Sequence, residues 1–187
     1  EAIRRWHDGE DSNLLERLST HPTPRIRRLA IEIEDRHDDS SKILDALRKD
    51  EDVEVLKRAW IRSLHRFSGE KFLDLATEAL ESRSVMIRRS AVNVAGRRGV
   101  DVIVESGLLD PSPTVVIESI RILSDNHPGL VECLQNGTSS VKAAAFQRIC
   151  DAREPTDEEL TYLLAEIGPN SIEVAFESLR GGIRWAS

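Results

Sequence analysis

The sequence predicts an all-α protein, a right-handed α-α superhelix (solenoid) in which helical hairpins stack on one another. Two observations predict this class. Hydrophobic residues make up 40% of the 187 residues but aromatic residues only 4%, so the interior must consist largely of Leu, Ile, Val and Ala, which suits stacked helices. A segment of about thirty residues also recurs along the chain, and a period of that size is typical of helical repeat proteins.

The recurring segment is clearest in six seven-residue stretches, each with a β-branched third residue. These residues lie 26 to 32 positions apart, and loops absorb such differences in length. The six residues are Ile26, Val55, Ile87, Val115, Val141 and Ile172. We expect a single domain over 1–187, with units at approximately 1–20 (partial), 21–50, 51–82, 83–110, 111–137, 138–168 and 169–187 (partial).

Each unit is expected to open with a helix whose apolar residues follow the i, i+3, i+4, i+7 spacing of an amphipathic helix. Pro24 and Pro113 suit the first turn of such a helix, because proline fixes φ there and its missing N–H would be unpaired anyway. Asp110 and Ser112 are expected to cap the free N–H groups. Two of the expected apolar faces are Ile26, Leu29, Ala30, Ile33 and Ile87, Ala91, Val94, Ala95.

A second apolar helix is expected after a polar or glycine-bearing break in each unit, at 38–41, 68–69, 99, 127–129 and 154–155. The last of these helices begins with a capping box, Thr156 to Glu159. Gly96, Gly99 and Gly107 are interpreted as helix-end residues. A hairpin of this size cannot bury its apolar face alone, so neighbouring hairpins must stack. The apolar residues expected in these helices include Ile43, Leu44, Leu47, Phe72, Leu73, Ala76, Ala79, Leu80, Val102, Ile103, Leu109, Leu130, Val131, Leu134, Leu160, Leu163, Leu164 and Ile167.

The starts of several units read DPSPTV at 110–115 and HPTPRIR at 21–27, and 50–55 keeps the acidic residues without the prolines. These stretches resemble the HEAT-repeat family, in particular the short HEAT-like repeats of the phycobilisome lyase type, whose pattern reads approximately D-P-x-P-x-V-R-x-x-A. The resemblance covers nearly the whole chain and implies stacked hairpins. It also implies that Arg27 and Arg88 occupy a packing and salt-bridge position between repeats. Because this repeat serves many unrelated roles, it does not determine the function.

The formal charge of -7 is divided unevenly along the chain. Residues 1–100 carry 20 Lys+Arg against 19 Asp+Glu, whereas residues 101–187 carry 6 against 14. The N-terminal half could therefore present a basic face that binds nucleic acid or another polyanion. The alternative is that these arginines pair with acids, for example Glu32 with Arg36 and Glu54 with Arg58. The possible polyanion-binding residues are Arg28, Arg58, Arg62, Arg66, Arg89 and Arg97.

The favoured function is a non-catalytic scaffold for protein–protein interaction, which binds an extended peptide, a helix or a domain along a superhelical groove. Exposed residues of the second helices are the first candidates for partner binding, namely Lys42, Asp45, Lys71 and Asp74. The resemblance also leaves open a lyase-like accessory role or a DNA glycosylase-like activity. No catalytic residue of such glycosylases can be matched to this sequence, and Trp6, Trp60 and Trp185 are scattered.

Catalytic, metal and cofactor sites are not expected. His7, His37, His65 and His127 fall near the end of a first helix or in the turn after it, but neighbouring repeats lie about 8–10 Å apart and zinc needs nitrogens at about 2.0–2.1 Å. The sequence has no HExxH, GxSxG, P-loop or GxGxxG motif.

A cytoplasmic location is expected. Cys133 and Cys150 fit buried free thiols in a reducing compartment. No apolar run of about 18 residues and no signal-peptide pattern is present, so we expect no membrane insertion. The sequence starts without Met in what reads as the end of a helix, so a longer chain is expected, and Trp6 and Trp185 are predicted to cover the ends of the superhelix.

Overall fold

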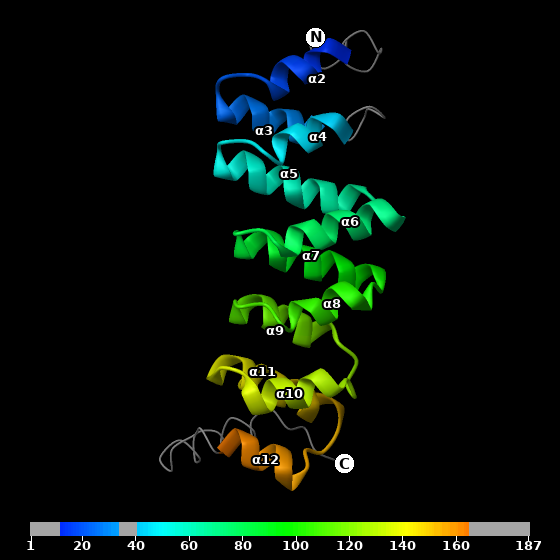
Figure 1. Ribbon diagram of the computed structural model, residues 1–187, viewed down its shortest axis with the longest axis vertical. Helices are drawn as coiled ribbons and strands as arrows, with labels where there is room; N and C mark the ends of the chain where they lie inside the picture. Colours follow the sequence, from blue (N-terminus) through cyan, green and yellow to red (C-terminus); the bar gives the residue numbers. More distant parts are fainter. Residues whose placement is uncertain (1–11, 34–40, 165–187) are drawn as a thin grey trace, which may run out of the picture. The chain divides into compact units, whose positions relative to one another are not determined.

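The computed structural model of the protein describes residues 12–33 and 41–164, and within these ranges it contains helices and turns but no strand (Figure 1). The all-α class is therefore confirmed for the described part of the chain. The helices are α2 (Ser12–Ser19), α3 (Pro24–Ile33), α4 (Ser41–Leu47), α5 (Val53–Arg66), α6 (Gly69–Leu80), α7 (Val85–Arg98), α8 (Asp101–Gly107), α9 (Pro113–Ile122), α10 (Pro128–Asn136), α11 (Ser139–Ala152) and α12 (Asp157–Leu164).

The chain divides into two compact units, Glu1–Val94 and Ala95–Ser187, with the boundary inside α7. In unit 1, α3 packs against α2 and α5, and α5 also packs against α4 and α6. In unit 2, α9 packs against α8 and α11, while α10 packs against α11 and α12. Helices that the sequence predicts to open successive hairpins are thus neighbours, α3 with α5 and α9 with α11.

The β-branched residues that define the repeat lie in the core. Val55, Ile87 and Val115 are fully buried and Val141 is 4% exposed, whereas Ile26 is only partly buried. Ile172 and Ile167 lie outside the described residues. Val55, Val115 and Val141 lie on α5, α9 and α11, each of which packs against at least two other helices.

The predicted apolar faces were correct for α7 and partly wrong for α3. Every residue of the predicted α7 face is buried. In α3, however, Leu29 is 42% exposed and its neighbour Ile31 is buried. Ala30 and Ile31 join a core cluster with residues of α2, α4 and α5, so the buried face of α3 is rotated by one residue from the predicted stripe.

The same kind of turn precedes four of the helices, α3, α5, α7 and α9. A side chain five residues before the β-branched position accepts a hydrogen bond from the backbone N–H two residues further on, which closes a tight turn before the helix. The acceptors and distances are His21 Nδ1 to Thr23 at 3.0 Å, Asp50 to Asp52 at 2.8 Å, Ser82 to Ser84 at 3.2 Å and Asp110 to Ser112 at 2.7 Å. Asp110 is thus a turn residue, while Ser112 forms no side-chain cap, contrary to the prediction.

Arg27 links the start of one repeat to the start of the next. Its Nε and Nη2 donate to the two Asp50 carboxylate oxygens at 2.6 and 2.8 Å, and its Nη1 donates to the carbonyl oxygen of His21 at 2.8 Å. The pKa of Asp50 is lowered by the hydrogen bond from Arg27. Arg27 therefore forms a salt bridge with Asp50, and Arg88 makes a contact equivalent to the one between Arg27 and His21, donating to the Ser82 carbonyl at 2.8 Å.

Gly96, inside α7, and Gly99, just after its end, have different roles. Gly99 follows the helix with φ of 68°, and the Val100 N–H bonds to the Ala95 carbonyl at 3.0 Å, which is the expected glycine-dependent end of a helix. Gly96 was predicted to be a helix-end residue but lies inside α7. A Cβ at Gly96 would lie 2.5 Å from Ile122 Cγ2, so the glycine permits the close approach of α7 to α9.

The predicted capping box at α12 is present. The Thr156 N–H donates to Glu159 Oε2 at 2.9 Å, and the Glu159 N–H donates to Thr156 Oγ1 at 3.3 Å. Arg153 adds a two-pronged contact to the same carboxylate, at 2.8 and 2.5 Å. Glu159 is 5% exposed. The hydrogen bonds from Arg153 are the largest cause of its lowered pKa, which falls from 4.5 to about 2.

Candidate functional site

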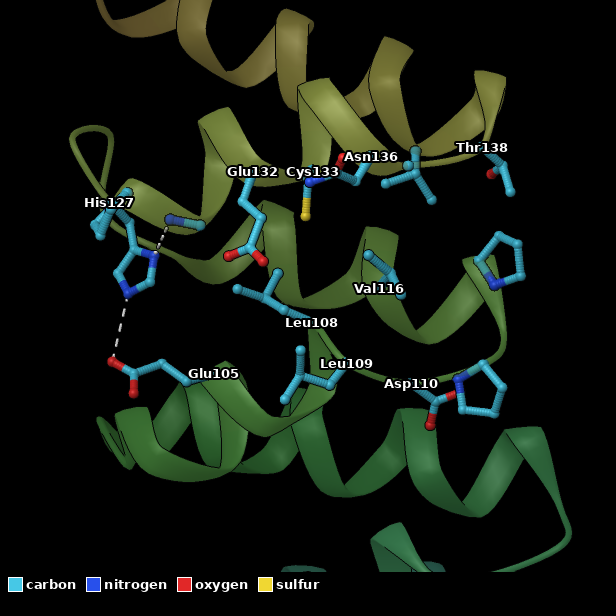
Figure 2. Close-up of a pocket in the computed structure, with 16 residues that line it drawn as sticks. Glu105, Leu108, Leu109, Asp110, Val116, His127, Glu132, Cys133, Asn136 and Thr138 are labelled. Carbon is cyan, nitrogen blue, oxygen red and sulfur yellow. Dashed lines mark hydrogen bonds and ion pairs between the residues drawn. The ribbon is translucent and has the colours of Figure 1, made fainter.

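Unit 2 contains a groove of about 730 Å³ between the α8–α9 turn and α10, named here the Leu109 groove (Figure 2). Its floor is apolar: Val116 of α9 is 7% exposed, Val141 of α11 is 4% exposed and Cys133 of α10 is 9% exposed. Leu108 and Leu109 form the opposite wall, and Figure 2 shows the Cys133 sulfur pointing into the space between the two walls. The groove therefore offers apolar contact surface on three sides.

Leu109 is 83% exposed at the edge of this groove. The sequence placed it on the apolar face of the second helix, which is wrong because α8 ends at Gly107. The N–H groups of Leu108 and Leu109 bond to the carbonyls three residues back, at 3.0 and 3.2 Å, so the chain tightens and turns after the helix. That turn carries Leu109 away from the core and leaves it beside the groove.

The rim of the groove is acidic. Glu105 and Glu132 are exposed at its edge, and none of its lining residues, all within the described ranges, is lysine or arginine. Asp110 also lines the groove, but its carboxylate accepts the Ser112 N–H. Figure 2 shows the Glu132 carboxylate directed across the groove toward Leu108.

His127 fixes the wall of the groove at the start of α10. Its Nδ1 accepts the Gly129 N–H at 3.1 Å, which caps the helix, and its Nε2 faces Glu105 Oε1 at 3.4 Å (Figure 2). A Cβ on Gly129 would lie 2.6 Å from Leu108 Cδ1, so the absence of a side chain allows α10 to lie close to the leucine. Of the break predicted at 127–129, His127 is the N-cap residue, whereas Pro128 and Gly129 already belong to α10.

The two cysteines do not supply a reactive thiolate. Burial raises the pKa of Cys133, and burial also raises the pKa of the partly buried Cys150. A thiol with a raised pKa remains protonated at neutral pH and is a weak nucleophile. Cys133 thus contributes apolar surface to the Leu109 groove.

The structure brings together only some of the predicted polyanion-binding arginines. Arg28 and Arg58 line a hollow between α3 and α5 together with Arg25 and Glu32. Arg58 Nη1 pairs with Glu32 Oε1 at 3.0 Å rather than with Glu54, which pairs with Lys57. The predicted Glu54–Arg58 pair is therefore wrong, because an acid on the neighbouring helix is closer. Arg36, the other predicted partner of Glu32, lies outside the described residues.

The remaining predicted arginines occupy other places. Arg62 and Arg66 are partly buried on α5, and Arg89 lines a separate hollow with His65. Arg97 is exposed on α7 and belongs to unit 2. The six residues thus do not share one hollow.

Of the four predicted partner-binding residues, Asp45 contacts Arg48, which the sequence analysis did not single out. Lys42, Lys71 and Asp74 are exposed on α4 and α6, and Lys71 Nζ lies 3.8 Å from the Phe67 ring centroid. Asp45 accepts a hydrogen bond from Arg48 Nη2 at 2.8 Å. Arg48 also lies over Trp60, at 4.6 Å, and 3.6 Å from Glu78. The tryptophan is buried, so only tertiary contacts could have identified this stack.

Within residues 12–33 and 41–164, no group of three or more His, Cys, Asp or Glu side chains could hold a metal ion, and no helix is long and apolar enough to cross a lipid bilayer. His7, His37, Trp6 and Trp185 lie outside these ranges. The chain matches no family model, no curated protein and no solved structure.

Proposed function

We propose that the protein is a non-catalytic scaffold that binds a short apolar and basic segment of a partner protein in the Leu109 groove. The observation that carries this proposal is the 83% exposure of Leu109 next to a buried apolar floor. Exposed apolar surface rimmed by polar residues is typical of interaction sites. Burying a leucine contributes about 1.5–3 kcal/mol, so a partner that covers Leu109 gains substantial affinity from this residue alone.

The negative charge at the rim determines which partner segments bind in the Leu109 groove. Glu105 and Glu132 stand at the rim without a lysine or arginine in the described lining, and residues 101–187 carry 6 Lys+Arg against 14 Asp+Glu. Complementary charge raises association rates and excludes wrong partners. The occupant is therefore a segment with one or two large apolar side chains flanked by lysine or arginine, and acidic segments are repelled.

The scaffold itself is proposed to be a right-handed superhelix of HEAT-like hairpins. Support comes from the pairing of first helices within each unit, α3 with α5 and α9 with α11, and from the shared turn at the starts of four repeats. In such a superhelix the second helices line a groove, where an extended partner would contact Lys42, Asp45, Lys71 and Asp74. A cytoplasmic location is proposed because both cysteines are free thiols.

The proposal is tested with a fluorescein-labelled peptide of leucine and lysine, and with a matched peptide of leucine and glutamate. Fluorescence polarisation should show tighter binding of the lysine peptide, and Leu109→Asp should weaken it by about ten-fold or more. The control is Val102→Asp, because Val102 is 57% exposed on α8 but does not line the groove. Equal affinity of the two peptides, or equal loss in both variants, would refute the proposal.

The location of the bound peptide can be measured directly. Methyl NMR of the saturated complex should shift the signals of Val116 and Val141, which form the floor, and leave Val55 and Val92 of unit 1 unchanged. Shifts spread over both units would mean that the peptide binds by general charge attraction instead.

A further inference from the structure

The hollow between α3 and α5 in unit 1 has a composition unlike that of the Leu109 groove. It has a volume of about 460 Å³ and is lined by Arg25, Ile26, Arg28, Leu29, Glu32 and Arg58. This set, named here the Arg28 hollow, has three guanidinium groups against one carboxylate, a formal excess of two positive charges. An anion is the ligand class that such a hollow attracts.

The arginines of this hollow differ from Arg27, which is fully engaged with Asp50 and two backbone carbonyls. Arg28 Nε is shielded from solvent and has no hydrogen-bond acceptor among the described residues. Part of the Arg28 cation has therefore lost its hydration without gaining a partner. A partly desolvated guanidinium interacts with an incoming anion more strongly than a fully hydrated one.

The helix dipole adds to this effect. Arg25 lies in the first turn of α3, which contains no acidic residue, and Arg28 follows directly after that turn. Positive side chains near the N-terminus of a helix oppose the dipole, whereas an anion is stabilised there. A bound anion would thus offset both the mutual repulsion of the arginines and their unfavourable position on α3.

In the absence of a ligand, the Glu32 carboxylate is paired with Arg58, one of the three arginines of the hollow. The Glu32–Arg58 pair is open to solvent, with side chains 58% and 51% exposed, and exposed pairs of this kind contribute little to stability. Arg58 can therefore exchange Glu32 for a stronger acceptor at small cost. A phosphate monoester carries about two negative charges at neutral pH and three acceptor oxygens, and its charge matches the excess in the hollow.

We propose that the Arg28 hollow binds the phosphate group of a phosphorylated serine or threonine in a partner protein. The neighbouring apolar side chain of that partner packs on Ile26 and on Leu29, which is 42% exposed. A peptide is favoured over a nucleic acid because none of the described lining residues is aromatic, and single-stranded nucleic acids are held largely by stacking on aromatic rings.

The first test compares two fluorescein-labelled peptides of alanine and leucine that differ only in one central serine, phosphorylated in one and unmodified in the other. Polarisation at low salt should show at least about ten-fold tighter binding of the phosphorylated peptide. Arg28→Gln and Arg58→Gln should remove this preference. Arg17→Gln, an exposed arginine of α2, should retain it. Equal binding of the two peptides would overturn the proposal.

The second test increases affinity and does not depend on a variant that loses a contact. Glu32→Gln removes the competing carboxylate, so it should tighten binding of the phosphorylated peptide several-fold. Glu81→Gln makes the same charge change at an exposed position outside the hollow and should have a smaller effect. Equal gains would show a general charge effect and overturn the proposal. A single-stranded DNA of equal charge that binds more tightly than the phosphopeptide, with the same dependence on Arg28, would also overturn it in favour of a nucleic acid.

Discussion

The two units place opposite chemistry on similar helical hairpins. In unit 1, arginines of α3 and α5 line a hollow, whereas in unit 2 the turn after α8 and the side of α10 form an apolar groove with an acidic rim. Each depression includes one of the β-branched residues of the predicted repeat, Ile26 in the Arg28 hollow and Val141 in the Leu109 groove. The comparison teaches that residues at matching sequence positions can stand beside surfaces of opposite charge.

Among the variants, replacement of Arg27 has the largest expected effect on the free energy of unfolding. It distinguishes an arginine that stabilises the fold from the arginines of the Arg28 hollow. Arg27→Met leaves the Asp50 carboxylate, 7% exposed, without its partner, so we expect a loss of about 3 kcal/mol in the free energy of unfolding. Urea denaturation measures this loss. Arg58→Met, which breaks an exposed pair, should cost less than about 1 kcal/mol.

A further variant checks the cause. Adding Asp50→Asn to Arg27→Met should recover part of the loss, because the asparagine is uncharged and still accepts the Asp52 N–H. No recovery would mean that the arginine acts through packing rather than through the ion pair.

Reversal of the charges on the rim of the Leu109 groove should change its preference from the basic peptide to the acidic one. In Glu105→Lys with Glu132→Lys, the leucine–lysine peptide should bind about ten-fold more weakly and the leucine–glutamate peptide more tightly, because the rim becomes positive. Polarisation measures both affinities. Glu51→Lys with Glu81→Lys makes the same change of net charge in unit 1, and a similar exchange of preference there would contradict the role of the rim.

Substitution of Gly96 tests how closely the helices of unit 2 are packed. Gly96→Ala should destabilise the protein by about 1 kcal/mol, since overlap with Ile122 outweighs the better helix propensity of alanine. Thermal unfolding measures the change. Ile122→Ala removes the Cγ1, Cγ2 and Cδ1 atoms that would overlap, so the double variant should lose less stability than the sum of the two single variants. A loss equal to or greater than that sum would exclude steric overlap as the cause.

Acid titration tests the ion pair between Arg153 and Glu159 in unit 2, which is expected to have a small effect on stability. The pKa of Glu159 is lowered from 4.5 to about 2, so its contribution to stability is complete above pH 4.5 and is lost as the pH falls toward 2. We expect about 1 kcal/mol, since Arg153 is 37% exposed and solvent screens the pair. Stability measured by urea denaturation between pH 5 and 2.5 should fall less steeply in Glu159→Gln than in Asp157→Asn, an exposed neighbour; equal slopes would contradict the assignment.

Many of the buried residues could be predicted from the sequence, because apolar residues recur along it at regular intervals and these residues form the core. Val55, Ile87, Val115 and Val141 are buried as their alignment predicted. Leu29 and Leu109 were misplaced for different reasons. The face of Leu29 depends on which helices pack against α3, and the exposure of Leu109 depends on a tightened turn that begins two residues earlier.

The candidate sites were less predictable, since each depends on contacts between side chains far apart in sequence. Arg28 and Arg58 were two of the six arginines predicted to bind a polyanion, but the sequence did not show that Arg58 pairs with Glu32 of α3 and not with Glu54. The Leu109 groove was missed entirely. The one available signal was the pair of leucines between Gly107, which was interpreted as a helix-end residue, and the DPSP stretch.

The turns before α3, α5, α7 and α9 show how one backbone shape can arise from different side chains. A histidine, two aspartates and a serine serve as the same acceptor at His21, Asp50, Ser82 and Asp110. Because a ring nitrogen, a carboxylate and a hydroxyl can each accept the same backbone N–H, this turn requires an acceptor atom at one place and not one type of residue.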